Sequence, residues 1–419
     1  MTDNMDLGSI SAETKATVLL TTRLGEMGDN LKPLSPAEFR SVQIWLKDRG
    51  LTSGDLLTGN HRAALNAMID EGVGTPLIPS MLERIPKLIR AVERWTKVGI
   101  WVTGETDDKF PVRLRQRLGL AGFPLLFGAG RMEFLNSGGV YIVGSRNSSD
   151  SGLQFSRLLA RRCGEEKITV ISSDMRGVDR EAIGAAGAVG GNIVCVLSDS
   201  LEKAVAARRH RKLIEQGNLM VVTPFSPDTR FRVANAIRVN RYQYGLADFA
   251  VIVETRRTGG VWLGAEENRK ENWVPAFVRA DGNVPLGNEA LLSLGLRPLT
   301  RKEILECGNI REHLISRLTL QSDSAPPDDT LAASSNDPGS QLFNIFCDQL
   351  AAFADTVARS PEEIQNHFGI EPEQAESWIA RAIEEGVLEQ FGDTDQYGVR
   401  HQNLRARRRT TQSIRRITQ

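Results

Sequence analysis

Between residues 139 and 278, short apolar runs alternate with stretches whose apolar positions recur at helical spacing. The apolar runs predict strands at VYIV (140–143), ITVIS (168–172), NIVCVL (192–197), LMVVT (219–223), FAVIVE (249–254) and VPAFV (274–278). The intervening stretches predict helices at Gln154–Cys163, Val178–Ala188, Ala204–Gln216, Phe231–Tyr244 and Val261–Lys270. Continuous apolar strands separated by helices predict an α/β fold with a doubly wound, Rossmann-like parallel sheet.

Helical patterning precedes this region. Ser35-Pro36-Ala37-Glu38 is a capping-box sequence with proline at the first helical position. Further helical stretches cover about 62–71 and 80–97. We therefore expect an N-terminal helical domain over residues 1–98, followed by the Rossmann-like domain over 99–318.

A change in composition marks the end of the second domain. Residues 319–341 are rich in Ser, Pro, Asp and Ala, which predicts a flexible linker. A second capping box at Ser360 then opens a helix to Phe368, followed by a helix over Pro372–Glu385 and two short strands around FGDTDQYG. This order is typical of a winged helix, which we place at 342–400. Because its second helix is acidic, DNA binding and a protein–protein or dimerisation role both stay open.

The charge of the chain is balanced overall but uneven along its length. Lys and Arg together number 52, as do Asp and Glu, yet residues 401–419 hold six arginines and no acid. Such a basic tail is typical of nucleic-acid-binding proteins, and it is equally typical of a solubilising extension.

Bulk composition narrows the class of protein. The 419 residues suggest two or three domains, and 41% hydrophobic with 25% charged residues is typical of a soluble globular protein. No apolar run is long enough to cross a membrane, and MTDNMDLGSISAETK lacks the features of a signal peptide, so we expect a cytoplasmic protein without a membrane partner. The four cysteines and five histidines have no metal-ligand spacing, so we expect no metal and no cofactor.

The stretch YIVGSRNSSDSG (141–152) runs from a predicted strand into a predicted helix through Gly144, Ser145 and Arg146. Such a junction holds anions, because helix N-terminal amides and small residues leave room for phosphate oxygens. The next glycine is Gly152, so the loop lacks the GxGxxG spacing of a dinucleotide site. The chain also has no GxxxxGK[ST] P-loop and no GxSxG elbow. Arg146 lies beside the N-terminus of a predicted helix, and both carry positive charge, so an anion between them is favoured.

More arginines are expected at the same edge of the sheet, because ligands of such sheets lie beyond the carboxyl ends of the strands. Arg176-Gly177 lies at the next strand–helix junction, RFRVANAIRVNR (230–241) carries four arginines, and Thr258-Gly259-Gly260 opens a further helix. Several arginines with no metal ligands and no evident base predict binding of a polyanion rather than catalysis.

Six segments in order resemble the DNA-processing protein A (DprA, also called Smf) family. They are ETDDKFPVRLRQRLGLAGFPLLFGAG (105–130), YIVGSR (141–146), ISSDMRGVDREAIGAA (171–186), VNRYQYGLADFAVIVET (239–255), TGGVWLGAEE (258–267) and VPAFVRADGNVPLGNEALLSLGLRPL (274–299). The resemblance covers about residues 100–305 and implies an extended Rossmann-like core, often followed by a winged helix.

The resemblance implies a function as well as a fold. It implies a non-enzymatic protein that binds single-stranded DNA without reading its sequence, acts in DNA processing and recombination, and hands DNA to the recombinase RecA. It also implies a homodimer formed through the Rossmann domain. Related proteins occur in phage defence and in toxin–antitoxin systems, so these roles, with a cognate toxin as partner, stay open.

Motif matching and the arginine pattern together give the predicted DNA- or phosphate-binding residues, which are Gly144, Ser145, Arg146, Arg176, Gly177, Arg238, Asn240, Arg241, Thr258, Gly259 and Gly260. The resemblance implies that the first three hold one phosphate, the next two frame a neighbouring pocket, and the last three close the edge. It gives Asn240 and Arg241 a structural or backbone-contacting role. Asp179 and Glu254 are interpreted as side chains that orient arginines rather than as catalytic acids.

The chain departs from the family pattern at several positions. Ser173 replaces a glycine, Met175 an alanine, Ile183 a histidine and Leu263 a threonine. Ala236 stands where the family has an aromatic residue. If that aromatic stacks on a base, the chain lacks a contact worth about 1–3 kcal/mol.

Two other functions are consistent with the pattern. The same edge of the sheet fits a nucleotide-binding sensor or an antitoxin-type interaction protein. The other function is that of a nucleotide phosphoribohydrolase, and such enzymes carry a PGGxGTxxE motif that part of this chain resembles. Here Gly259-Gly260 and Glu266-Glu267 are present, but the residues at 261–263 (VWL) disrupt the spacing.

Overall fold

A computed structural model describes residues 7–24, 31–58, 62–119, 122–319, 343, 346–347, 349–350, 353, 359–384, 388–390 and 396–399. The chain divides into two compact units, Met1–Arg230 with Asn235–Leu331, and Phe231–Ala234 with Ala332–Gln419. The predicted linker beyond residue 319 and the basic tail at 401–419 lie outside the described residues.

The first unit contains a nine-stranded sheet in the order β1-β2-β6-β5-β4-β3-β7-β8-β9. The strands are β1 Ile100–Gly104, β2 Leu125–Ala129, β3 Val140–Val143, β4 Val170–Ser172, β5 Ile193–Val196, β6 Leu219–Thr223, β7 Phe249–Ile252, β8 Ala276–Arg279 and β9 Arg297–Leu299. β2 pairs antiparallel with β1 and β6, and every other neighbouring pair is parallel. All six strands predicted from apolar runs are confirmed as β3 to β8, and β1, β2 and β9 are additional.

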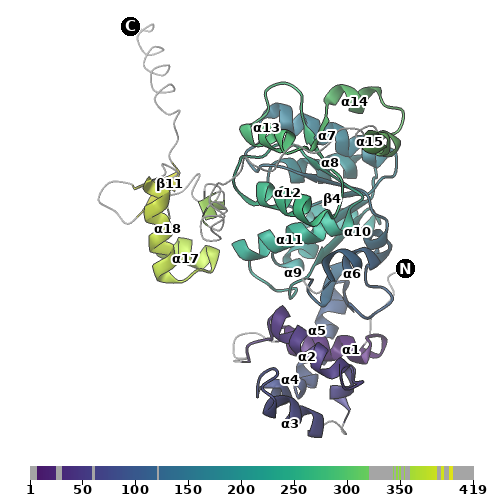
Figure 1. Cartoon of the computed structure of the whole chain (residues 1–419), viewed down its shortest axis with the longest axis vertical. Coiled ribbons are helices and arrows are strands. Elements are labelled where there is room, and N and C mark those ends of the chain that lie inside the picture. Colours follow the sequence, from purple (N-terminus) through teal and green to yellow (C-terminus); the bar gives the residue numbers. More distant parts are fainter. Residues whose placement is uncertain are drawn as a thin grey trace. The chain divides into compact units, whose positions relative to one another are not determined.

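Helices cover both faces of this sheet (Figure 1). They are α6 Val112–Leu118, α7 Asp150–Glu165, α8 Val178–Ala188, α9 Leu201–Ala206, α10 Arg208–Glu215, α11 Val233–Leu246, α12 Gly260–Glu271, α13 Leu286–Ser293, α14 Arg301–Glu306 and α15 Ile310–Thr319. Alternate residues of β3 enter two different cores, Val140 and Ile142 with α7 and α8, and Tyr141 and Val143 with α11 and α12. This alternation confirms the predicted α/β sheet covered on both faces. The sheet was predicted to be parallel, and it is mostly so, because only β2 runs antiparallel to the other strands.

Two predicted helices are each broken into two. The expected helix over 80–97 consists of α4 Ile78–Leu82 and α5 Ile85–Lys97, because Pro86 lacks an amide proton and its ring would clash with the preceding turn of a continuous helix. The expected helix over 204–216 is interrupted at Ala207, whose backbone is extended, with ψ 126°.

The N-terminal helices are α1 Ala12–Thr21, α2 Pro36–Lys47, α3 Arg62–Asp70, α4 and α5. The capping box of α2 is present: the Glu38 amide donates to Ser35 Oγ, and the Ser35 amide donates to Glu38 Oε2 at 2.6 Å. Trp95 of α5 packs edge-on against Phe127 of β2, with ring centroids 5.2 Å apart. The helices therefore share one hydrophobic core with the sheet.

The second unit contains α17 Pro361–Phe368, α18 Pro372–Glu384 and an antiparallel pair of strands, β10 Leu388–Gln390 and β11 Tyr397–Val399. The Ser360 capping box is present. The order helix, helix, strand, strand agrees with the predicted elements, and the winged-helix interpretation of this unit stays a prediction. Within the described residues, no helix is long and apolar enough to span a membrane.

Candidate nucleic-acid interface

The strand order changes direction between β3 and β7. From β3 the chain adds β4, β5 and β6 on one side, and from β7 it adds β8 and β9 on the other. Ligands of open α/β sheets bind beyond the carboxyl ends of the strands at such a switch point. The rim is defined here as the loops that follow β3, β4 and β7 (144–149, 173–177 and 253–259) together with Gly260, the first residue of α12. The loops hold seven of the predicted site residues, and Gly260 is the eighth: Gly144, Ser145, Arg146, Arg176, Gly177, Thr258, Gly259 and Gly260.

The first rim loop is fixed mainly through its backbone. The Ser145 amide donates to the Glu254 carbonyl oxygen at 2.8 Å, which joins the loop after β3 to the end of β7. Ser148 Oγ donates to the Ser145 carbonyl oxygen at 2.9 Å, and the helix that follows is capped by Ser149 Oγ, which accepts from the Gly152 amide. Arg146 is half-buried, and its guanidinium lies 3.4 Å from Met175 Sδ on the second rim loop. The loops after β3 and β4 are therefore in direct contact.

Gly177 makes this contact a close one. Its φ is +92°, a left-handed conformation that favours glycine, and a Cβ atom there would lie 2.5 Å from the Ser145 carbonyl oxygen and 2.6 Å from that of Arg146. Only a residue without a side chain fits between the two loops. Arg176, directly before it, is exposed.

A buried ion pair lies beneath the rim. Glu254 is 3% exposed and Arg279 of β8 is 1% exposed, and Arg279 Nη2 donates to Glu254 Oε1. The same carboxylate accepts from the Ser149 amide at 2.8 Å and from Ser149 Oγ. The carboxylate thus links Arg279 of β8 to the start of α7, and its interpretation as a side chain that orients an arginine stays a prediction.

Asp179 is buried under the first rim loop. It accepts from the Gly144 amide at 3.4 Å and from Ser173 Oγ. Burial raises its pKa to about 7, although these hydrogen bonds and the charge of Arg146 act in the opposite direction. Ser173, which departs from the family pattern, thus supplies a hydroxyl donor to a buried carboxyl group.

The third rim loop opens α12. Gly259 precedes the helix with φ +91°, and Thr258 is exposed beside it. Asn240 of α11 donates to the Gly260 carbonyl oxygen at 2.9 Å, which joins α11 to the start of α12. The structural or backbone-contacting role that the resemblance implied for Asn240 stays a prediction. Buried Asn288 supports the loop from below by accepting from the Thr255 amide at 2.9 Å.

Sequence reasoning missed Arg279, Asn288 and the acidic residue of the second rim loop, Asp174. Asp174 is flanked by Arg209, Arg180 and the buried His210, which together lower its pKa despite the opposing effect of burial. None of these contacts leaves a local signal, because their partners come from other strands and helices.

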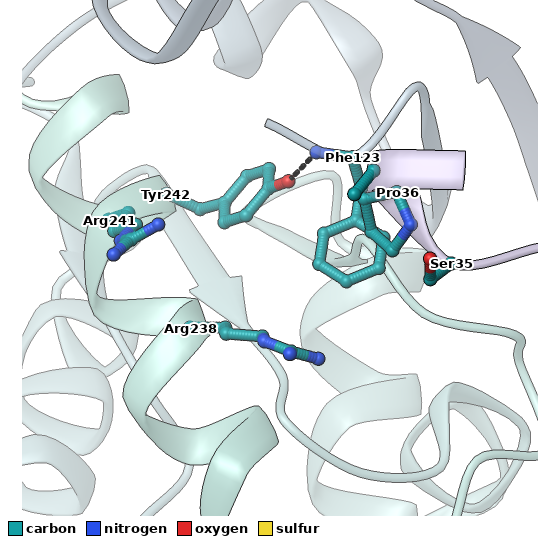
Figure 2. A pocket seen from close by; sticks show the side chains of 7 residues that line it. Ser35, Pro36, Phe123, Arg238, Arg241 and Tyr242 are labelled. Carbon is teal, nitrogen blue, oxygen red and sulfur yellow. Dashed lines mark hydrogen bonds between the residues drawn. The ribbon is translucent and has the colours of Figure 1, made fainter. Parts of the chain in front are cut away.

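Two predicted residues line a different pocket. Arg238 and Arg241 of α11 belong to a cavity of about 270 Å³ that is also lined by Ser35, Pro36, Ala37, Phe123 and Tyr242 (Figure 2). Arg241 also pairs with Glu267 of α12 at 2.6 Å. We call this cavity the junction pocket. None of the residues that line it belongs to the rim, so the structure does not bring all the predicted site residues together.

No group of three or more His, Cys, Asp or Glu side chains within the described ranges is arranged to hold a metal ion.

Comparison with known proteins gives consistent matches. Residues 101–299 match the family model described as DNA recombination-mediator protein A. The chain is 32% identical to Protein Smf of Escherichia coli (strain K12) over 201 residues, which cover 46% of this chain and 53% of that protein. The match thus spans about half the length of this relative.

Solved structures also align. DNA processing protein A from Streptococcus pneumoniae has a TM-score of 0.45 and 19% identity, and the alignment covers 65% of this chain and 97% of that one. DNA processing protein A from Helicobacter pylori, whose structure is described as giving its single-stranded DNA binding mode, has a TM-score of 0.42 and 20% identity, with 52% and 96% coverage.

Proposed function

We propose, from the match of residues 101–299 to the family model of DNA recombination-mediator protein A, that this protein binds single-stranded DNA and acts in DNA processing and recombination. The supporting observation is the position of Arg146. It lies at the switch point of the sheet, on a loop fixed to β7 by the Ser145 amide, with the exposed Arg176 on the adjoining loop. Cationic side chains at this edge suit the phosphates of a strand without reading its bases.

The test is the salt dependence of oligonucleotide binding. For Arg146→Ala, we expect the affinity for a fluorescent oligothymidine to fall about tenfold, because a charge-assisted hydrogen bond is lost. The slope of log affinity against log salt should also become shallower by about 0.7, the value for one phosphate contact on a single strand. Fluorescence anisotropy between low and physiological salt measures both quantities.

The matched control is Arg269→Ala. Arg269 is an exposed arginine on α12 outside the rim, so its substitution removes the same charge without changing the proposed site. If Arg146→Ala and Arg269→Ala bind with the same affinity and the same salt slope as the parent, the assignment of the rim is wrong.

The finer roles belong to the same proposal. We propose the rim residues Gly144, Ser145, Arg146, Arg176, Gly177, Thr258, Gly259 and Gly260 as the phosphate-binding set. Transfer of DNA to RecA, a homodimer through the sheet domain, and a winged helix over 342–400 are proposed on the family resemblance. Genome defence, with a cognate toxin as partner, is the alternative use of the same DNA-binding surface.

We propose a non-catalytic role for the rim. Glu267 of the candidate hydrolase motif is paired with Arg241, and Glu254 of the rim is held by Arg279 and Ser149, so both of these carboxylates are already engaged. Incubation with nucleoside monophosphates followed by chromatography should release no free base. Release of base would favour the phosphoribohydrolase reading. Tight calorimetric binding of a small nucleotide at the rim, without oligonucleotide binding, would favour the sensor.

A further inference from the structure

The junction pocket lies where the N-terminal helices meet the sheet domain. Ser35, Pro36 and Ala37 come from the start of α2, Phe123 precedes β2, and the remaining walls come from α11 (Figure 2). Its volume of about 270 Å³ lies just below the usual range of small-molecule sites, about 300–1,000 Å³. A ligand in it would be one small unit rather than an extended molecule.

The charge of the pocket is positive. Its lining contains two arginines and, within the described residues, no carboxylate. Arg238 is exposed and has no ion pair among the described side chains, while its guanidinium lies 5.8 Å from the Phe123 ring. Arg241 uses Nη2 for Glu267, and its buried Nε has no hydrogen-bond partner within the described part of the chain. Two arginines thus line the cavity, and each has hydrogen-bonding capacity unused within the described residues, which suits an anion.

The pocket also has an aromatic wall and a hydroxyl donor. The Phe123 ring is half-buried and is held edge-on by Phe225, with centroids 5.2 Å apart, so its position is fixed. Tyr242 is 2% exposed, and its hydroxyl oxygen accepts from the Phe123 amide at 2.5 Å, which leaves the phenol proton free to be donated. Burial raises the pKa of this phenol, so the proton is retained at neutral pH.

A phosphate and a planar ring within one small unit describe a nucleotide. Aromatic side chains stack on any base, and guanidinium groups bind phosphate oxygens through paired hydrogen bonds. We propose that the junction pocket binds one nucleotide unit, with its phosphate on Arg238 and Arg241 and its base on Phe123. The unit is either a free 5′-mononucleotide or one residue of a single strand, and both present the same chemistry.

This second site gives the N-terminal helices a direct part in ligand binding. Ala236, where the family has an aromatic residue, lies on α11 near Arg238, and Phe123 offers an aromatic ring from another element. The proposal does not depend on the rim, because the two sets of lining residues are separate.

The experiment measures binding of dTMP, dAMP, inorganic phosphate and a 5′-phosphorylated oligothymidine to the full chain by calorimetry. We expect Arg238→Ala to weaken mononucleotide binding about tenfold. Phe123→Leu keeps the apolar contact with Phe225. It should weaken nucleotide binding about tenfold and leave the affinity for inorganic phosphate unchanged. Arg269→Ala should bind like the parent, and a thermal melt of each variant verifies folding.

The outcomes separate the two sources of the unit and the two proposals. Mononucleotide binding that depends on Arg238 identifies a free nucleotide, and oligonucleotide binding alone that depends on Arg238 and Phe123 identifies a strand. If Arg238→Ala and Phe123→Leu change the affinity neither for the mononucleotides nor for the oligonucleotide, the junction pocket is not a nucleotide site. The same conclusion follows if Arg269→Ala weakens binding as much as these two substitutions. In that event, loss of oligonucleotide binding in Arg146→Ala would still leave the proposed function standing.

Discussion

Asp179 is a single side chain whose ionisation bears on the whole rim. It is 5% exposed, it bonds the Gly144 amide and Ser173 Oγ, and Arg146 is the charged group that favours its ionised form. The carboxyl is therefore held between a neutral form favoured by burial and an anion favoured by its neighbours.

The stability of the protein should depend on pH through this residue. Its folded pKa of about 7 lies above the ordinary 3.8, so between these values the folded state binds more protons than the unfolded one. The free energy of unfolding should therefore fall as pH rises through this window, and this contribution should be constant above it. Asp179→Asn removes the contribution, so its stability relative to the parent should rise by about 2 kcal/mol between pH 5 and pH 7.5.

Urea unfolding of both proteins at the two pH values measures this difference. The carboxamide of Asp179→Asn keeps an oxygen for the Gly144 amide and donates to Ser173 Oγ, so the loop should keep its geometry. A stability gap that stays the same at both pH values would show that Asp179 ionises normally.

Residue-scale prediction from the sequence succeeded where the chemistry is local. Gly144, Arg146 and Gly177 lie together at strand–helix junctions, because parallel strands place those junctions at one edge. Arg279 could not be predicted as the partner of Glu254, because their contact depends on the pairing of β7 with β8. Arg238 and Arg241 were predicted beside the rim, whereas they line the junction pocket, because the face on which a helix packs is set by tertiary contacts.

Helix α8 provides an element-scale comparison between two of its glycines. Gly177 caps the helix with φ +92° and lies against two carbonyl oxygens, whereas Gly184 is exposed in the middle of the helix, where a Cβ would meet no atom within 4 Å. One glycine is required by the contact between loops, and the other only lowers helix stability.

Alanine substitutions at the two glycines should therefore change the free energy of unfolding in opposite directions. Gly177→Ala should reduce the free energy of unfolding by about 2 kcal/mol or more, because a left-handed alanine must also displace the first rim loop. Gly184→Ala should raise it by about 0.5–1 kcal/mol. Chemical denaturation of both variants measures these changes, and a Gly177→Ala protein as stable as the parent would contradict the tight fit of the loops.

Element boundaries were predictable except where a distant contact intervenes. AVAARRHRK (204–212) contains no proline or glycine, so its pattern predicted one helix, yet the chain breaks at Ala207. The buried His210 explains the break: its Nδ1 lies 3.0 Å from the Ala204 carbonyl oxygen, which in a continuous helix would accept from an amide four residues later. Its Nε2 faces Asp174 at 3.5 Å, a contact that leaves no local signal.

At the scale of the whole first unit, the N-terminal helices and the sheet share a core. Trp95 and Leu88 of α5 are buried in the same cluster as Val102 and Phe127 of the sheet. Polar contacts reinforce this: Arg40 of α2 binds both oxygens of Glu105 at 2.6 and 2.8 Å. Apolar periodicity predicts which face of an element is buried, but not which element covers it, so this sharing was not predictable.

A chain that begins at residue 99 should therefore be unstable. Removing α5 would expose the apolar face of β1 and β2, so we expect a lower thermal midpoint and strong binding of an apolar dye compared with the full chain. Calorimetry and dye fluorescence measure both. A shortened chain with the midpoint of the parent would show that the sheet does not need this cover.

The contact between Gly177 and the first rim loop also bears on how such a site evolves. Gly177 meets the carbonyl oxygens of Ser145 and Arg146, not their side chains. Side chains on the first loop can therefore be exchanged without disturbing the fit, while position 177 tolerates almost no change. Ser173 and Met175, which depart from the family pattern on the second loop, make their contacts with Asp179 and Arg146 through side chains and not through the backbone fit of Gly177. In a mutational scan, ligand preference would drift at positions 145, 146 and 175 while the backbone frame that presents them stays constant.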